Sequence, residues 1–100
     1  MIILRQKMRA KPGKSDELMA ALAEIIGPAR ATEGVISLDI ARVLLEPDSF
    51  IATVVYEDAP ALERQESLPE VDKVVAMLPG SLAAPLERTI FDASLDAALA

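Results

Sequence analysis

The run FIATVVY, residues 50–56, is apolar on both faces of the β-strand that it predicts. It is dense in Val and Ile, which strands favour, and successive side chains of a strand point to opposite faces of the sheet. Helices that cover only one face of a small antiparallel sheet leave the other face in water. We therefore expect a second cover over this sheet, and another copy of the same chain is the simplest source of one.

Two further strands are expected before this run. Residues 35–46 alternate as a strand, and residues 47–49, Pro-Asp-Ser, have the composition of a hairpin turn. Residues 2–11 also alternate, and they end at a Pro-Gly turn. One face of the longer strand carries Ile36, Leu38, Ile40, Arg42 and Leu44, and one face of the first strand carries Ile2, Leu4, Gln6, Met8 and Ala10.

Apolar side chains recur at helical spacing between and after these strands. Residues 15–30 form one such segment behind Ser15, which we expect to cap the helix N-terminus. Asp58 is expected to cap a short helix. Pro69 is expected in the first turn of another helix, which ends at the dipeptide of residues 79–80, Pro-Gly.

A last strand over residues 85–92 completes the order β-α-β-β-α-β, with the second helix broken in two. This order predicts an α+β fold of ferredoxin-like type, an antiparallel sheet with helices on one face. Connection rules place the first and third strands in the centre of the sheet. One hundred residues suffice for one domain, which we expect to span residues 1–93, followed by an alanine-rich C-terminal tail over residues 94–100.

Composition excludes several classes of function. The chain has no Cys and no His, so it lacks the ligands of an ordinary zinc site, a disulfide, a thiol nucleophile and a His-based triad. Its formal net charge of −6 opposes binding to nucleic acid. No stretch reaches the roughly 20 apolar residues of a membrane span, and the first residues lack the order of a secretory signal. We expect a cytoplasmic protein with neither nucleic acid nor membrane as its partner.

Short motifs follow one another along the chain: KPGK at residues 11–14, ARATEG at 29–34, EPDSF at 46–50, YEDAPAL at 56–62 and SLPEV at 67–71. Together they resemble the antibiotic biosynthesis monooxygenase family of the dimeric α/β-barrel superfamily. The resemblance implies a homodimer whose sheets pack into a barrel, with a ligand cavity between the sheet and the helices of each subunit. It also implies oxidation of quinols, polycyclic phenols or anthrones by O2 without a metal, flavin or other cofactor.

The chain departs from this family at several positions. Where the family commonly has Glu and then Trp near the end of the third strand, this chain has Val54 and Tyr56. Where the family commonly has His residues, this chain has Gln65 and Glu70. A haem-degrading branch of the superfamily needs a proximal His, so the absence of His argues against that branch.

Five polar side chains are the candidate site residues. Tyr56 replaces the family's Trp and is the candidate for substrate orientation or proton transfer, the alternative being a packed aromatic. Gln6 and Arg42 interrupt apolar faces and are candidates for substrate binding, the alternatives being an amide bonded to backbone and an ion pair. Gln65 and Glu66 follow the helix corner where the family has a His. Gln65 is a candidate hydrogen-bonding group. Glu66, like Glu70, is a candidate base if burial raises its pKa, the alternative for these acids being a solvated surface group.

Arg5, Lys7 and Arg9 form a basic stripe on the other face of the first strand. We expect them to pair across strands with acids such as Asp39 or Glu87, although recognition of an anionic ligand is an alternative.

Two hypotheses for the function remain open, besides a purely structural partner domain. The first is a cofactor-independent monooxygenase that acts on a quinol or a polycyclic phenol. The second is a non-catalytic dimer that binds or senses a small aromatic ligand. The enzyme requires a closed, dry cavity that holds at least one group with a displaced pKa, whereas a binding protein could manage with a shallow apolar cleft.

Overall fold

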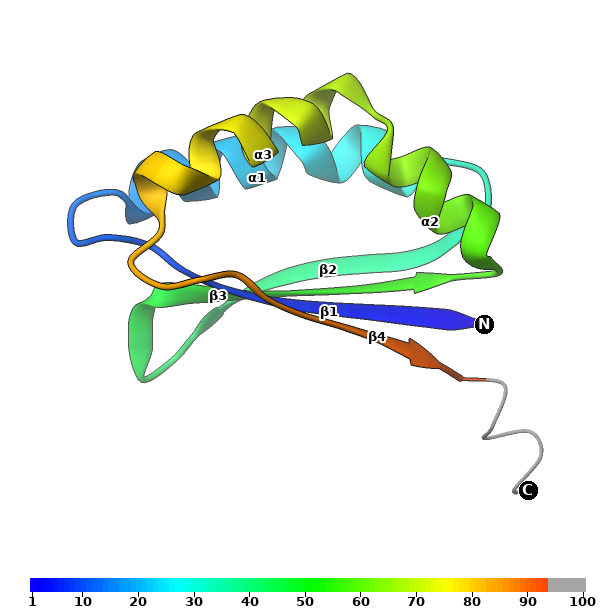
Figure 1. The fold of residues 1–100 in the computed structure, drawn as a ribbon, viewed down its shortest axis with the longest axis horizontal. Helices are drawn as coiled ribbons and strands as arrows, with labels where there is room; N and C mark the ends of the chain where they lie inside the picture. The colour runs from blue at the N-terminus through cyan, green and yellow to red at the C-terminus, as the bar shows by residue number, and fades with distance from the viewer. Residues whose placement is uncertain (94–100) are drawn as a thin grey trace.

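The computed structural model describes residues 1–93, and the predicted tail at residues 94–100 lies outside the described residues. The elements follow the expected order (Figure 1). They are β1 (Ile2–Arg9), α1 (Ser15–Arg30), β2 (Val35–Val43), β3 (Glu46–Tyr56), α2 (Ala59–Glu66), α3 (Pro69–Ser81) and β4 (Glu87–Asp92).

The strands form a four-stranded antiparallel sheet in the order β2-β3-β1-β4. The first and third strands are central, as the connection rules predict. The helices all lie over one face of this sheet, and the opposite face is open (Figure 1). The predicted ferredoxin-like α+β arrangement is therefore confirmed.

The hydrophobic core lies between the sheet and α1. Leu4 and Met8 of β1 and Phe50 and Val54 of β3 are buried on the side that faces the helices. Helix α1 covers them with a stripe of buried side chains at helical spacing, namely Leu18, Leu22, Ile25 and Ala29. The alternation of the strands and the periodicity of α1 thus meet in one apolar layer.

The predicted hairpin turn at residues 47–49 is wrong. Val43 pairs with Glu46, so the turn consists of Leu44 and Leu45, which are 96% and 95% exposed. Residues 47–49 lie inside β3 because contacts from elsewhere hold them there. The backbone oxygen of Asp48 accepts a hydrogen bond from the N–H of Ala10 at 2.8 Å. The carboxylate of Asp48 also accepts one from the Ser15 hydroxyl.

Other local expectations are corrected in the same way. Ser15 does not cap α1, because Lys14 occupies the N-cap position and the Ser15 hydroxyl is bonded to Asp48. Helix α3 continues through Pro79 to Ser81, where the N–H of Leu82 still reaches the oxygen of Leu78 at 2.9 Å. By contrast, the expected cap of α2 is confirmed, since Asp58 accepts from the N–H of Ala61 at 3.0 Å.

A register shift near the start of β2 changes the face of one residue. Val35 pairs with Tyr56 and Ser37 with Val55, which leaves Ile36 as an extra residue. Val35 therefore packs against the core, and Ile36, expected on the same face as Leu38, is exposed.

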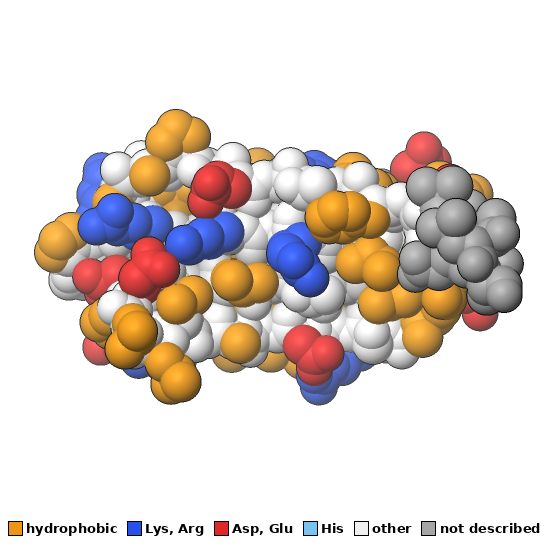
Figure 2. All heavy atoms as spheres, turned by 90° about the horizontal axis from the view of Figure 1, so that it is seen from below, with side chains coloured by type: hydrophobic (Ala, Val, Ile, Leu, Met, Phe, Trp, Pro, Cys, Tyr) orange, Lys and Arg blue, Asp and Glu red, His pale blue; other side chains and the backbone are white. Residues whose placement is uncertain are grey.

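The open face of the sheet combines apolar and basic side chains (Figure 2). Ile3, Ile51 and Val55 are half-buried there, and Phe91 is 43% exposed. Arg5 lies over the Phe91 ring at 5.8 Å from its centre.

The ion pairs on this face differ from the expected ones. Lys7 pairs with Glu46 at 3.3 Å rather than with Glu87, and Asp39 faces Arg30 at 3.9 Å rather than a residue of the basic stripe. Glu46, the acid that pairs with Lys7, directly follows the turn at residues 44–45 and is the first residue of β3. Within residues 1–93, no helix has the length and apolar character needed to cross a membrane.

Candidate functional site

A cavity of about 250 Å³ lies between the sheet and the helices. Its volume is near the lower limit of the roughly 300–1,000 Å³ of small-molecule sites. Its walls are mostly apolar side chains from β1, β2, β3, α1 and α3, among them Leu4, Ile25, Leu38, Val54, Val74 and Leu78. Four polar side chains complete the lining: Gln6, Gln65, Glu66 and Arg88.

Strand register and one ion pair bring these four side chains into neighbouring positions. Gln6 of β1 and Arg88 of β4 are direct partners in the register of the two strands. Gln65 and Glu66 are consecutive residues at the end of α2. The carboxylate of Glu66 forms an ion pair with Arg88 and accepts a hydrogen bond from its guanidinium. The cavity thus has an apolar body and one polar region, an arrangement that fixes the orientation of a small ligand.

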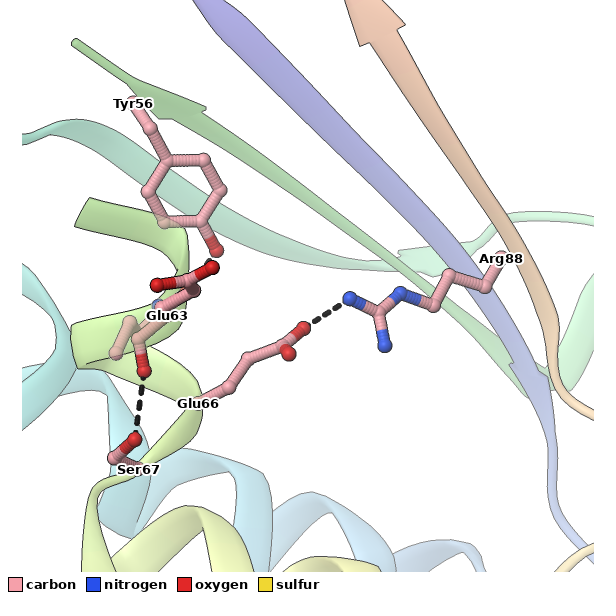
Figure 3. A network of polar contacts seen from close by, with 6 residues as sticks. Tyr56, Glu63, Glu66, Ser67 and Arg88 are labelled. Atoms are coloured by element: carbon pink, nitrogen blue, oxygen red, sulfur yellow. Dashed lines mark hydrogen bonds and ion pairs between the residues drawn. The ribbon is translucent and has the colours of Figure 1, made fainter. Parts of the chain in front are cut away.

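The Glu66–Arg88 pair bridges the helical layer and the sheet. Figure 3 shows the guanidinium of Arg88 reaching from β4 towards the Glu66 carboxylate on α2. The two side chains are 37% and 38% exposed, so water reaches the pair. Arg88 is therefore a cation at the boundary between the cavity and solvent.

Tyr56 lies behind this lining rather than in it. Its side chain is fully buried, and its hydroxyl donates a hydrogen bond to Oε1 of Gln65. Burial raises the pKa of Tyr56 well above its ordinary value of about 10, and the negative charge of Glu66 raises it further, against a smaller opposing effect of Arg88. Tyr56 is consequently a protonated donor at neutral pH, and it reaches the cavity only through Gln65.

Arg42 is placed away from the cavity. Its guanidinium lies over the Phe50 ring, 5.3 Å from the ring centre, and Nη2 is 3.5 Å from the sulfur of Met19. Arg42 interrupts an apolar strand face, but its guanidinium contacts an aromatic ring and a methionine rather than the cavity.

Of the five candidate site residues, Gln6, Gln65 and Glu66 line one cavity, whereas Tyr56 and Arg42 do not. The lining also contains Arg88, which sequence reasoning missed. A signal for Arg88 was present in the sequence. Arg88 interrupts the apolar face that it shares with Leu86 and Ile90, just as Gln6 interrupts the face that it shares with Leu4 and Met8. Without the strand register, nothing in the sequence indicates that the two interruptions are neighbours.

The family model described as "antibiotic biosynthesis monooxygenase" matches residues 1–77. The chain belongs to the antibiotic biosynthesis monooxygenase family. In this family member, β4 and its Arg88 lie beyond the matched residues, whereas Gln6, Gln65 and Glu66 lie within them.

Solved structures share the fold of this antibiotic biosynthesis monooxygenase family member. A Mycobacterium tuberculosis protein is 21% identical with a TM-score of 0.85, over 91% of this chain and 92% of that one. A Nitrosomonas europaea protein with the same family designation is 14% identical with a TM-score of 0.87, over 92% and 97%. A Chloroflexus aurantiacus protein, also with that designation, is 30% identical with a TM-score of 0.72, over 91% and 92%.

No protein of curated function matches the chain. Among the described residues 1–93, no group of three acidic, His or Cys side chains is placed to hold a metal ion.

Proposed function

We propose that the cavity binds a small aromatic molecule and that the protein is a cofactor-independent monooxygenase acting on a quinol, a polycyclic phenol or an anthrone. The observation that carries this proposal is the 250 Å³ apolar cavity with its single polar region. Membership of the family supports the reaction class. An apolar cavity suits fused rings, and the polar region suits the oxygen substituent that such substrates carry.

The reaction demands little of the protein, because the substrate supplies the electrons. For an anthrone, one C–H proton of the ring methylene passes to a base and leaves a carbanion whose charge is shared with the oxygen. The carbanion forms a C–O bond with O2, and the resulting peroxide anion takes the proton back from the base. Loss of water then breaks the O–O bond and the second C–H bond. One methylene group and one O2 molecule thus give one carbonyl group and one water molecule, with no external reductant. Glu66 is the lining carboxylate that could accept the proton, and Arg88 the cation that could stabilise the oxyanion.

The experiment is oxygen uptake with a panel of quinols and anthrones. Ala52→Leu fills the cavity from β3, because Ala52 is buried and lines it, so uptake should fall to background. Ala23→Leu is the matched control on an exposed position of α1 and should keep full activity. Tyr56→Phe should reduce the rate without abolishing it, since Tyr56 acts only through Gln65. Absence of uptake above background with every substrate would refute the enzyme.

A non-catalytic ligand-binding protein of the same fold is the second candidate, and one observation favours it. The two side chains best suited to move a proton both already have partners: Tyr56 is bonded to Gln65, and Glu66 to Arg88. Saturable binding of panel compounds without oxygen uptake would support this candidate against the enzyme.

We also propose that the protein is a homodimer in which a second copy covers the open face of the sheet. The half-buried Ile3, Ile51 and Val55 and the partly exposed Phe91 support this, because together they leave apolar surface on the face without helices (Figure 2).

A further inference from the structure

Both side-chain amides of the chain lie in the cavity wall. The sequence contains no Asn and only two Gln residues, and these two, Gln6 and Gln65, line the same cavity. Gln6 is on the sheet side, in β1, and Gln65 is on the helical side, in α2. Amides placed on facing walls of an apolar cavity are suited to recognising a polar group on a ligand.

The amide of Gln65 is hydrogen-bonded to Tyr56. The Tyr56 hydroxyl donates to Oε1 of Gln65, and both residues are buried, Gln65 being only 6% exposed. Because Oε1 is the end of the amide that faces the Tyr56 hydroxyl, the NH2 group is the end directed away from Tyr56 and is left for other partners. The neighbouring Glu66 carboxylate lines the same cavity and favours having the positive NH2 end on that side.

Two other groups of the polar region, Gln6 and Arg88, can also donate to a ligand. No residue within the described residues 1–93 forms a side-chain hydrogen bond with Gln6, so its amide can turn its NH2 group towards a ligand. Arg88, its cross-strand partner, can only donate. The acceptor in the set, Glu66, is engaged by Arg88.

We propose that Tyr56 is a positioning residue that holds the Gln65 NH2 group towards the cavity, so that the site selects ligands carrying an acceptor oxygen, such as an aromatic ketone. This inference rests on the proposed function only in that the cavity binds a small aromatic molecule. It goes further in stating which polar group the ligand must present and which residue enforces the choice.

The test compares 1-tetralone with tetralin, two bicyclic molecules that differ by a carbonyl oxygen. A ketone accepts hydrogen bonds and cannot donate them, so the pair isolates a donor site. Nitrogen–proton correlation spectra of the full chain contain side-chain NH2 signals from Gln6 and Gln65 alone, which makes the contact directly visible. We expect 1-tetralone to bind about fivefold more tightly than tetralin, as one added hydrogen bond predicts, and to shift the Gln65 signals.

Variants then separate positioning from packing. Gln65→Met removes the donor and should remove most of the preference for the ketone. Tyr56→Phe should lower the preference towards the Gln65→Met value while leaving tetralin binding unchanged, because the amide is free to rotate. Thr53→Val is the matched control, since it removes a hydroxyl from the same strand on the face away from the cavity.

The outcomes distinguish this inference from the proposed function. If the unaltered protein binds both compounds equally well, the proposed selection of acceptor ligands is wrong, whereas the proposed binding of aromatic molecules in the cavity is supported. An undiminished preference in a folded Tyr56→Phe variant would overturn the positioning role. If Tyr56→Phe does not fold, an undiminished preference in Gln65→Met would overturn the inference. Binding of neither compound would refute the proposed cavity function and this inference together.

Discussion

Gln6 and Arg88 stand directly opposite each other on the neighbouring strands β1 and β4, and both side chains line the cavity. Side chains of such a pair lie on the same face of the sheet and close enough to interact. Two adjacent polar side chains thus interrupt an otherwise apolar sheet wall at one place. The polar region of the cavity exists because of this register, and Glu66 on α2 closes it from the helical side.

Replacing Arg88 with Met should weaken the binding of anionic aromatic ligands. A hydrogen bond to a charged group contributes about 1.5–3 kcal/mol, so affinity for 1-naphthoate should fall about tenfold or more, while affinity for neutral 1-tetralone changes much less. Isothermal titration calorimetry measures both. The free energy of unfolding should change by less than about 1 kcal/mol, because the Glu66–Arg88 pair is more than one-third exposed.

The control for Arg88→Met is Arg9→Met, an exposed basic residue of β1 on the other face of the sheet. Glu66→Gln should have the opposite effect. It removes the carboxylate that pairs with Arg88, so the affinity for 1-naphthoate should rise several-fold. If Arg88→Met lowers the affinity for the anionic and the neutral ligand equally, a charge-specific role of Arg88 is contradicted.

Tyr56 should resist ionisation until the protein unfolds. It is the only Tyr in a chain without Trp, so the ultraviolet absorbance of tyrosinate reports on this residue alone. Because burial raises the pKa in the folded state above the unfolded value of about 10, the stability that comes from the neutral hydroxyl is complete below about pH 10. It is lost as the pH rises towards the folded pKa, so the free energy of unfolding should decrease in this range. A reversible titration of the folded protein near pH 10 would contradict this prediction, and Tyr56→Phe gives the reference curve for all other groups.

Replacing Gly34 with Ala should destabilise the protein by about 3 kcal/mol. Gly34 has a φ of 87°, and a Cβ there would lie 2.6 Å from the Cβ of Ala61 on α2. The left-handed backbone costs about 1 kcal/mol and the overlap about 2 kcal/mol more. Gly13→Ala is the matched control, because Gly13 has a φ of 82° with nothing within 4 Å, and it should cost only about 1 kcal/mol. Urea unfolding measures both, and adding Ala61→Gly should restore part of the loss only in the Gly34 variant.

A charge on the open face of the sheet should prevent dimer formation. Ile51→Glu places a carboxylate at the centre of that face, opposite Lys7 and Ala41 in the strand register. Lys7 is already paired with Glu46, so the new carboxylate would compete for that cation, and burying the surplus negative charge in an apolar interface is strongly unfavourable. Sedimentation velocity should show a dimer for the unaltered protein and a folded monomer for Ile51→Glu, with Ala23→Glu on exposed α1 remaining dimeric. A monomer for the unaltered chain at micromolar concentration would contradict the proposed dimer.

Local patterns account for the correct part of the sequence-based predictions. The strand alternation around Leu4 and the helical spacing from Leu18 to Ile25 depend only on neighbours in the chain, and both define the buried faces correctly. The cap at Asp58 is equally local. The run over residues 50–56 is apolar on both faces, so its own pattern did not show which face is buried. The hairpin prediction failed because distant contacts decide this segment. Asp48 is a residue type typical of turns, but hydrogen bonds to Ala10 and Ser15 hold it in β3.

By itself, the amino-acid sequence determined the order of the elements, the family and which face of β1 is apolar, because these depend on periodicity and on short motifs. Only the tertiary structure decided which polar side chains share the cavity. Gln6, Gln65 and Arg88 come from β1, α2 and β4, and a slip of one residue in strand register would turn Arg88 to the opposite face. Likewise, the burial that keeps Tyr56 protonated beside Gln65 arises from packing between segments distant in the chain.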